Sequence, residues 1–311
     1  MLSFCDLSTR TFIQHLQEGY RSTYGSLNTS HIDCLGRAAE LALSTLARCD
    51  AAYHDAEHTR LVTLAGQEIL LGKQKLEGGV APETWLNSIV AWLFHDIGYV
   101  KGACRQDCPE CNLYATGISD RLIELSPTAT AASLTPHHVD RSKQFVREQF
   151  GDCSIIDAET IEGNIELTRF PVPKDKGYAD TFGYAALTRT ADLIGQLADP
   201  RYLEKLPALY CEFEETGANA CLGCQNAGDL RATYPNFFWK VAHPYFKDGL
   251  RYLEATQLGK QIVTNLYANV FTVERELQQA ACRQSSLDLG PRCTIGSNRA
   301  KSKKNRTLAK V

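Results

Sequence analysis

The segment TWLNSIVAWLFHDI, residues 84–97, decides the fold class of this chain. Its apolar positions recur at the spacing of a helix, which predicts a buried helix. These positions are Leu86, Ile89, Val90, Leu93, Phe94 and Ile97. His95 and Asp96 lie inside this pattern, and a buried carboxylate needs a cation or strong hydrogen bonds. Because imidazole and carboxylate groups are ligands for divalent metals, a metal site is the simplest explanation for the His-Asp doublet.

Upstream of this segment, the motif YHDAEHT at residues 53–59 carries two more histidines. His54 and His58 are four residues apart and would share one face of a helix. The spacing permits two metal ligands, or one ligand and one acid–base group; the alternative is a pair of partly buried structural histidines. The chain has 8 histidines, and the gathering of three of them in two short motifs favours a site.

Downstream, Asp192 lies in the apolar stretch LTRTADLI, residues 187–194. It is either a fourth metal ligand or the partner of Arg189, three residues earlier on the same helix face. A set of two histidines and two aspartates leaves coordination positions open for water, as a hydrolytic metal requires. The doublet His137-His138 has two interpretations as well: a contribution near the metal, or the start of a helix.

The rest of the chain reads as helix and loop, with no alternating strand pattern. The predicted helices cover residues 9–20, 33–48, 55–72, 84–97, 117–125, 138–149, 156–167, 182–197, 200–215, 236–254 and 257–279. Loops are predicted at 99–115, 126–136, 169–181 and 216–235, where Pro, Gly, Asp and Asn gather. Pro82 is expected to begin a helix, and Gly98 to end the one that carries the doublet. The fold class is therefore all-α, with a single domain at 1–281 and a core at about 50–255.

Charge is distributed unevenly along the chain. Residues 282–311 contain eight Lys or Arg and one acid, which is a net charge of +7. The other residues carry a net charge of −10, which gives the total of −3. This basic segment is poor in apolar residues and predicts a disordered tail that adheres weakly, at most, to nucleic acid. The acidic body argues against nucleic acid as the main ligand. No apolar run is long enough for a membrane span and no signal-peptide pattern is present, so we expect a cytoplasmic protein.

The chain has 12 cysteines, and without a secretion signal we expect reduced thiols. Two pairs have the spacing of a zinc knuckle, Cys108 with Cys111 and Cys221 with Cys224, and the four thiolates are a candidate structural metal site. An iron–sulfur cluster and plain loop thiols are the alternatives.

The ordered set Tyr53-His54-x-x-x-His58, His95-Asp96 and Ala191-Asp192-Leu193 resembles the HD-domain metal-dependent phosphohydrolase superfamily. It is most similar to the branch that contains the cyclic-nucleotide phosphodiesterases, over roughly residues 50–255. That branch also has counterparts of Val62, His137-His138, Phe237 and Val241-Ala242-His243-Pro244. The stretch ADLIGQLADP, residues 191–200, also resembles uncharacterised cyanobacterial members of the superfamily.

The resemblance implies an HD-type helical bundle in which His58, His95, Asp96 and Asp192 bind one metal. Asp96 would bridge to a second metal completed mainly by water, and His54 would donate a proton to the leaving oxygen. Phe237 would stack on a substrate base. Three positions depart from the pattern of the family: Tyr99 replaces a histidine, Tyr234 replaces the purine-reading glutamine, and Thr168 stands where other members have a histidine.

Together these features predict a hydrolase of a small-molecule phosphodiester or nucleotide that uses one or two Mg, Mn, Zn or Fe ions. Histidine titrates near neutrality, which suits His54 to proton donation. Arg189, Lys174 and Lys176 are candidates for holding the phosphate charge. Two alternatives remain: a di-iron oxygenase of the same superfamily, and a non-catalytic module that binds a metal or a nucleotide.

Overall fold

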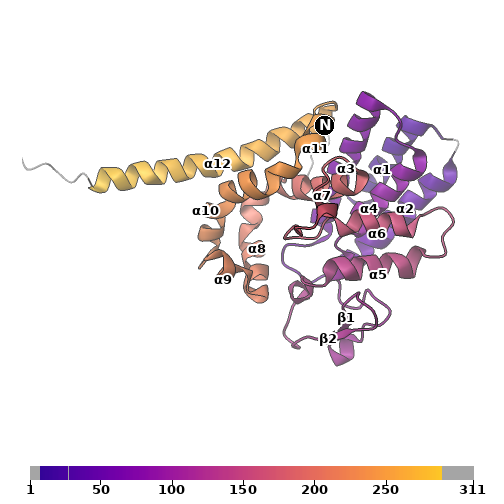
Figure 1. The fold of residues 1–311 in the computed structure, drawn as a ribbon, viewed down its shortest axis with the longest axis horizontal. Helices are drawn as coiled ribbons and strands as arrows, with labels where there is room; N and C mark the ends of the chain where they lie inside the picture. Colours follow the sequence, from indigo (N-terminus) through magenta and orange to yellow (C-terminus); the bar gives the residue numbers. More distant parts are fainter. Residues whose placement is uncertain (1–7, 27, 289–311) are drawn as a thin grey trace, which may run out of the picture. The chain divides into compact units, whose positions relative to one another are not determined.

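The computed structural model of the chain describes residues 8–26 and 28–288. Within these residues the chain is built from twelve α-helices and one two-stranded sheet, so the all-α prediction is confirmed (Figure 1). It divides into two compact units, Met1–Glu274 and Arg275–Val311. Residues 282–288 continue the last helix instead of beginning a disordered tail, and residues 289–311 lie outside the described residues.

The helices follow one another along the chain, with the two longest connections at residues 95–137 and 167–183. They are α1 (Thr9–Tyr24), α2 (Thr29–Leu46), α3 (Ala56–Glu77), α4 (Pro82–Phe94), α5 (His138–Phe150), α6 (Ala158–Glu166), α7 (Tyr184–Leu197), α8 (Tyr202–Thr216), α9 (Ala218–Leu222), α10 (Ala227–Phe237), α11 (Lys247–Leu253) and α12 (Gln257–Asp288). Pro82 occupies the first position of α4, as predicted.

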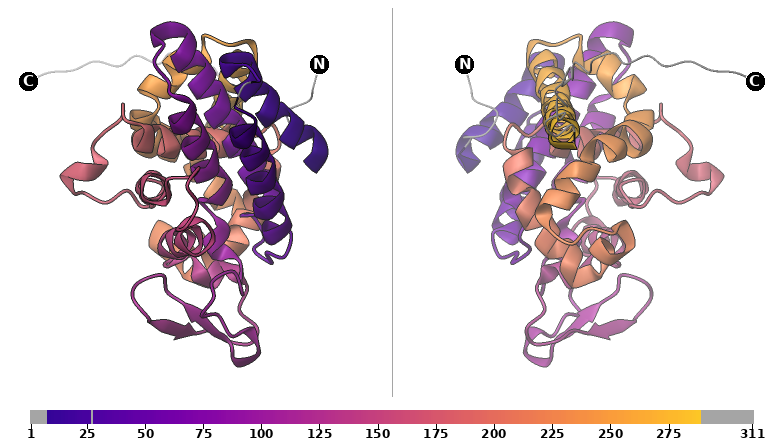
Figure 2. Two further views of the ribbon diagram at one scale, coloured as in Figure 1. Left: turned by 90° about the vertical axis from the view of Figure 1, so that its right-hand side faces the viewer. Right: turned by 90° about the vertical axis from the view of Figure 1, so that its left-hand side faces the viewer.

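The centre of the larger unit is formed by α3, α4 and α7, most of whose residues are buried among the surrounding helices (Figure 2). Gly195 lets α7 pack closely on α3. A Cβ atom at this position would lie 2.6 Å from Val62 Cα, which is nearer than a side chain tolerates. Trp92 is fully buried, and its indole N–H donates to Thr188 O at 3.4 Å, which joins α4 to α7. These contacts fix the mutual positions of the three helices that carry the candidate ligands.

The predicted helix at 117–125 is wrong. The segment forms part of a small hairpin, in which β1 (Leu113–Ala115) pairs with antiparallel β2 (Leu122–Glu124). Gly117 has a φ of +78°, and its Cα faces the backbone of α5 so closely that a Cβ atom would lie 2.2 Å from Asp140 C. The turn therefore needs a glycine, and packing on α5 overrides the weak helical pattern of the segment.

Two more segments differ from prediction. The predicted loop at 216–235 contains α9 and most of α10. The predicted helix at 236–254 is interrupted by a π-helix at Phe238–Ala242 and a 3-10 helix at His243–Tyr245 before α11. Pro244 lacks the N–H that a continuous α-helix needs at this point.

None of the helices in residues 8–26 and 28–288 combines the length and the apolar character needed to cross a membrane.

Candidate metal centre

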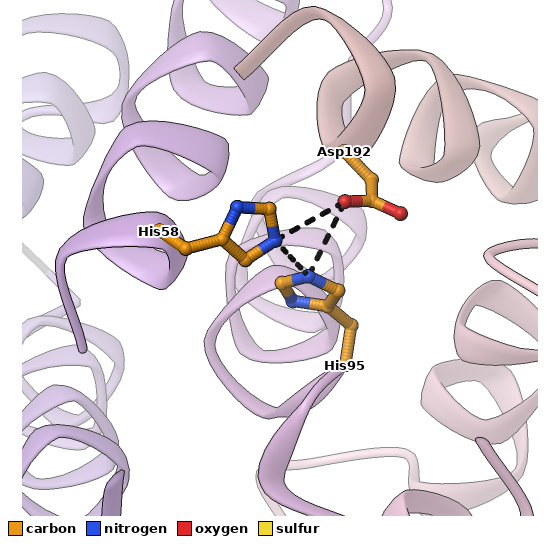
Figure 3. A group of neighbouring side chains, drawn as sticks. All are labelled: His58, His95 and Asp192. Atoms are coloured by element: carbon orange, nitrogen blue, oxygen red, sulfur yellow. Dashed lines mark hydrogen bonds and ion pairs between the residues drawn. The ribbon is translucent and has the colours of Figure 1, made fainter. Parts of the chain in front are cut away.

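Three helices bring the candidate ligands together. His58 lies in the first turn of α3, which begins because the Asp55 carboxylate caps the N–H groups of Glu57 and His58 at 2.8 and 2.9 Å. His95 is the C-cap of α4, and Asp192 belongs to α7. Figure 3 shows the two imidazoles and the Asp192 carboxylate pointing toward one another.

His95 and Asp96 follow α4 instead of lying inside it, because α4 ends at Phe94. Asp96 leaves the helical backbone with a ψ of 6°, and a 3-10 turn at Ile97–Tyr99 follows. The prediction that Gly98 ends this helix is also wrong, because α4 already ends at Phe94. The role of Gly98 is close approach: a Cβ atom there would lie 1.9 Å from His138 O on α5.

The ligand atoms of His58, His95 and Asp192 are spaced as the ligands of a single ion would be, and Asp96 lies beside the two imidazoles. His58 Nε2 and His95 Nε2 are 3.3 Å apart. Asp96 Oδ2 lies 3.2 Å from both nitrogens, and Asp192 Oδ1 lies 3.4 and 3.5 Å from them. Ligands at about 2.1 Å from one ion are about 3.0 Å apart at right angles and about 3.4 Å apart in a tetrahedron. Among the described residues, His58, His95 and Asp192 form the one group of three or more ligand atoms that all lie within 4.8 Å of one another.

The hydrogen bonds of the cluster direct an imidazole nitrogen lone pair toward carboxylate oxygens. His95 Nδ1 donates to Trp92 O at 2.7 Å, so the neutral imidazole presents the lone pair of Nε2 to the two carboxylates. Asp96 Oδ2 is buried and lacks a hydrogen bond of acceptable geometry from any described residue, as does His58 Nδ1. Buried acceptors in this arrangement need either protons on the imidazoles or a metal cation between them.

The charges of the cluster lead to the same conclusion. Burial lowers the pKa of His58, but the Asp192 and Asp96 carboxylates outweigh it and raise the pKa to about 9. Burial raises the pKa of Asp192, and the two imidazoles outweigh it and lower the pKa to about 2. Two protonated histidines would balance two carboxylates, and one divalent cation with neutral imidazoles gives the same net charge. The residues therefore fit a divalent metal ion, whose ligands must shed their protons.

His54 precedes α3 instead of lying on it, which corrects the predicted shared helix face, yet its ring centroid lies 5.5 Å from that of His58. Its Nδ1 is 2.6 Å from Glu212 Oε2. Glu212 Oε1 also accepts from the backbone N–H groups of Tyr53 and His54, at 2.6 and 3.1 Å. Burial raises the pKa of Glu212, and the hydrogen bond from His54 outweighs it and lowers the pKa. Glu212 therefore stays ionised and fixes the orientation of the imidazole.

Glu212 is the residue that sequence reasoning missed. It lies on α8 at helical spacing from the buried Tyr202, Leu206 and Leu209, and it is itself buried. An acid on the apolar face of a predicted helix is the same signal that singled out Asp96 and Asp192.

A stack of three rings covers one side of the cluster. Tyr99 lies between His54 and His138, with centroid distances of 4.6 and 4.5 Å and interplanar angles of 15° and 17°. His138 Nδ1 donates to Thr135 O at 2.6 Å, which directs its Nε2 lone pair to within 3.9 Å of Asp96 Oδ1. His138 therefore lies beside the cluster, and His137 is the N-cap of α5. A contribution of the doublet near a metal stays a prediction.

A family model described as Npun_R2479-like matches residues 3–276. The chain belongs to the Npun_R2479-like family. No curated protein matches it. The matched region includes His54, the four candidate ligands and Glu212, so the site belongs to the part of this Npun_R2479-like chain that defines the family.

Two predicted substrate contacts are corrected by their burial. Arg189 is 2% exposed, and its guanidinium donates to Tyr178 O and Asp180 O at 2.8 and 2.6 Å. It anchors the segment before α7 instead of facing a phosphate, and it does not pair with Asp192. Tyr234 is also 2% exposed and packs against Tyr202.

Phe237 is half-buried at the end of α10 and meets the exposed Phe170 edge to face at 5.9 Å. Lys174 and Lys176 are exposed in the segment between α6 and α7. The substrate contacts of these three residues stay predictions.

The four cysteines of the candidate structural site are not brought together. In the part of the chain that the structure describes, no group of three or more metal-ligating atoms includes a thiol. Cys108 and Cys111 lie next to β1, whereas Cys221 and Cys224 lie in and after α9. The 109 residues between the two pairs form several separate elements.

Proposed function

We propose that this chain is a metal-dependent phosphohydrolase of the HD type that cleaves a small-molecule phosphodiester or nucleotide. The observation that carries the proposal is the convergence of His58, His95 and Asp192, with Asp96 beside them, on one point next to His54. The order of these residues along the chain, and their resemblance to the HD superfamily, support the choice of reaction.

The donor set favours some ions over others. Two imidazoles with two carboxylates suit Zn²⁺, Fe²⁺ or Mn²⁺, because Mg²⁺ and Ca²⁺ prefer oxygen ligands alone. A divalent ion held there would neutralise phosphoryl charge and lower the pKa of a water molecule. The residues around it would then have to position the substrate and move protons.

His54 is suited to protonating the leaving oxygen. Its Nδ1 is occupied by Glu212, so Nε2 is the nitrogen that would hold the proton to be donated. The Glu212 carboxylate fixes the orientation of the imidazole, and the ring of Tyr99 stacks on it and restricts its rotation. General acid catalysis of this kind contributes about 10²–10⁴-fold to a rate.

The proposal is tested by elemental analysis of the purified protein, followed by assays with bis-p-nitrophenyl phosphate and a panel of nucleotides and phosphodiesters. We expect about one or two ions of Mn, Fe or Zn per chain and hydrolysis that stops on chelation. Iron with oxygen consumption would favour the oxygenase alternative, and ligand binding without turnover would favour the non-catalytic module. Either result would contradict the proposal.

His54→Gln should lower turnover by about 10²–10⁴-fold and leave the metal content unchanged, because His54 donates protons instead of binding the ion. Glu212→Gln should lower turnover less and change its pH profile, since it orients the same ring. Glu215→Gln is a matched control on α8: Glu215 accepts from Thr130 at 2.8 Å and has no described contact with His54. Loss of metal in His54→Gln, or equal losses in both glutamate variants, would contradict this assignment.

A further inference from the structure

The turn that precedes β1 places two thiols close together in the chain. Cys108 and Cys111 flank Pro109 and Glu110 in a 3-10 turn, and the neighbouring Cys108 thiol raises the pKa of the Cys111 thiol. The Cys111 N–H donates to Cys108 O at 3.0 Å, which closes the turn. Cys108 is half-buried and Cys111 is exposed. The pair is therefore both preorganised and accessible.

The geometry of the turn suits a disulfide. A turn closed by this hydrogen bond keeps its first and fourth Cα atoms within about 7 Å, and disulfides span about 4.4–6.8 Å between Cα atoms. The Cys108 N–H donates to Leu113 O at 2.8 Å, and the Leu113 N–H donates to Cys108 O at 3.2 Å. This double hydrogen bond fixes the base of the turn, so little chain entropy is lost when the sulfurs are joined.

The segment before the turn is anchored as well. Asp107 binds the guanidinium of Arg141 through both carboxylate oxygens at 2.9 Å. Arg141 lies on α5, so the dithiol stands on a fixed base at the surface.

The second CxxC pair has the same spacing in a different environment. Cys221 is exposed at the end of α9, whereas Cys224 is 6% exposed. The burial of Cys224 holds one thiol of this pair away from reagents. Cys221 and Cys224 are therefore a natural control within the same chain.

We propose that Cys108 and Cys111 form a redox-active dithiol that exchanges with a small-molecule disulfide such as oxidised glutathione. The Cys111 thiolate attacks one sulfur of the external disulfide, forms a mixed disulfide and releases one thiol. The Cys108 thiolate then attacks Cys111 Sγ, forms the intramolecular disulfide and releases the second thiol. The protein loses two electrons and two protons, and the external disulfide gains them. This proposal is independent of the proposed hydrolase activity.

The test equilibrates the full chain with a series of glutathione redox buffers containing a chelator, then alkylates the remaining thiols and digests with trypsin. The peptide of residues 106–121 contains Cys108 and Cys111 and no other cysteine, and the peptide of residues 206–231 contains the control pair and Cys211. We expect the first peptide to become lighter by two hydrogens at an oxidised glutathione concentration at least about tenfold lower than the second requires. A first peptide that stays fully alkylated, or equal oxidation of both, overturns the proposal.

A trapping variant tests the order of the two steps. Cys108→Ser should hold glutathione on Cys111, because the second exchange is blocked, while Cys221→Ser should leave oxidation of the first peptide unchanged. If Cys108→Ser carries no glutathione on Cys111 under the conditions that oxidise the wild type, the exchange mechanism is wrong.

Discussion

Two clusters of charged side chains in this chain differ in whether all their buried polar atoms have hydrogen-bond partners. Arg141 is fully buried and places all its donors: Nε on Gly98 O, Nη1 on Asp107 and Ala115 O, and Nη2 on Asp107 and Val100 O. Asp107 in turn accepts from the backbone N–H groups of Ala115 and Gly102 at 2.8 and 2.9 Å. One cation and one anion with complete hydrogen bonding make a structural pair.

In the cluster of candidate ligands, His58, His95 and Asp96 are buried and the Asp192 side chain is 18% exposed. This cluster brings two carboxylates to two imidazoles and leaves Asp96 Oδ2 without a good donor. A buried network with incomplete hydrogen bonding is costly. The comparison teaches that burial of charge alone does not indicate a ligand site; an unmatched excess of acceptors does.

The largest expected effect is the loss of metal and activity when the candidate ligand Asp192 is removed. Asp192→Ala should remove bound metal and lower phosphoester turnover by at least about a thousandfold, because metal catalysis contributes several kcal/mol and each 1.36 kcal/mol is tenfold in rate. Elemental analysis and kinetics measure both losses, and circular dichroism checks the fold. Full metal content in this variant would contradict the ligand set.

The next effect concerns folding. Arg141→Met should lower the free energy of unfolding by about 3–5 kcal/mol, because Asp107 would be left as an uncompensated buried charge. Urea denaturation measures the loss. In the double variant Asp107→Asn/Arg141→Met the loss should be smaller than the sum of the two single losses. Additive losses would show that the two side chains do not stabilise each other.

A third prediction tests whether a cation completes the unsatisfied cluster. At a concentration of about 100 times its Kd, a divalent ion should raise the free energy of unfolding by about 2.7 kcal/mol. Chemical denaturation with and without Mn²⁺ or Zn²⁺ measures the difference. Asp192→Ala is the control and should show little gain; an equal gain would place the ion elsewhere, for example on the cysteines.

The smallest effect is expected at the partly exposed ion pairs that Glu166 forms with Arg169 and Lys143. Burial raises the pKa of Glu166, but hydrogen bonds from Arg169 and Lys143 outweigh it and lower the pKa to about 2. Because the folded pKa is below the unfolded value of about 4.5, this stabilisation is present above pH 4.5 and is lost as the pH falls from 4.5 toward 2. Solvent screening limits it to about 1 kcal/mol.

Urea midpoints of the wild type and Glu166→Gln, measured from pH 7 to pH 3, should therefore differ most at neutral pH and converge in acid. A difference that grows in acid would contradict the lowered pKa.

The sequence by itself determined the helical class and singled out the four candidate ligands and His54. Helical periodicity of apolar residues is a local property that burial preserves, as α3, α4 and α7 show. An acid or a histidine inside such a pattern indicates a functional site because burying it is costly. The same criterion predicts Glu212 as a site residue.

Only the tertiary structure decided which of these groups meet. Asp192 lies 134 positions after His58, and close packing of α7 on α3 at Gly195 brings its carboxylate to 3.4 Å from the imidazole. The tertiary structure also decided that Arg189 bonds to backbone carbonyls and that Tyr234 is buried against Tyr202. Sequence spacing specifies which face of an element a residue occupies, whereas contacts between distant elements depend on how whole faces pack.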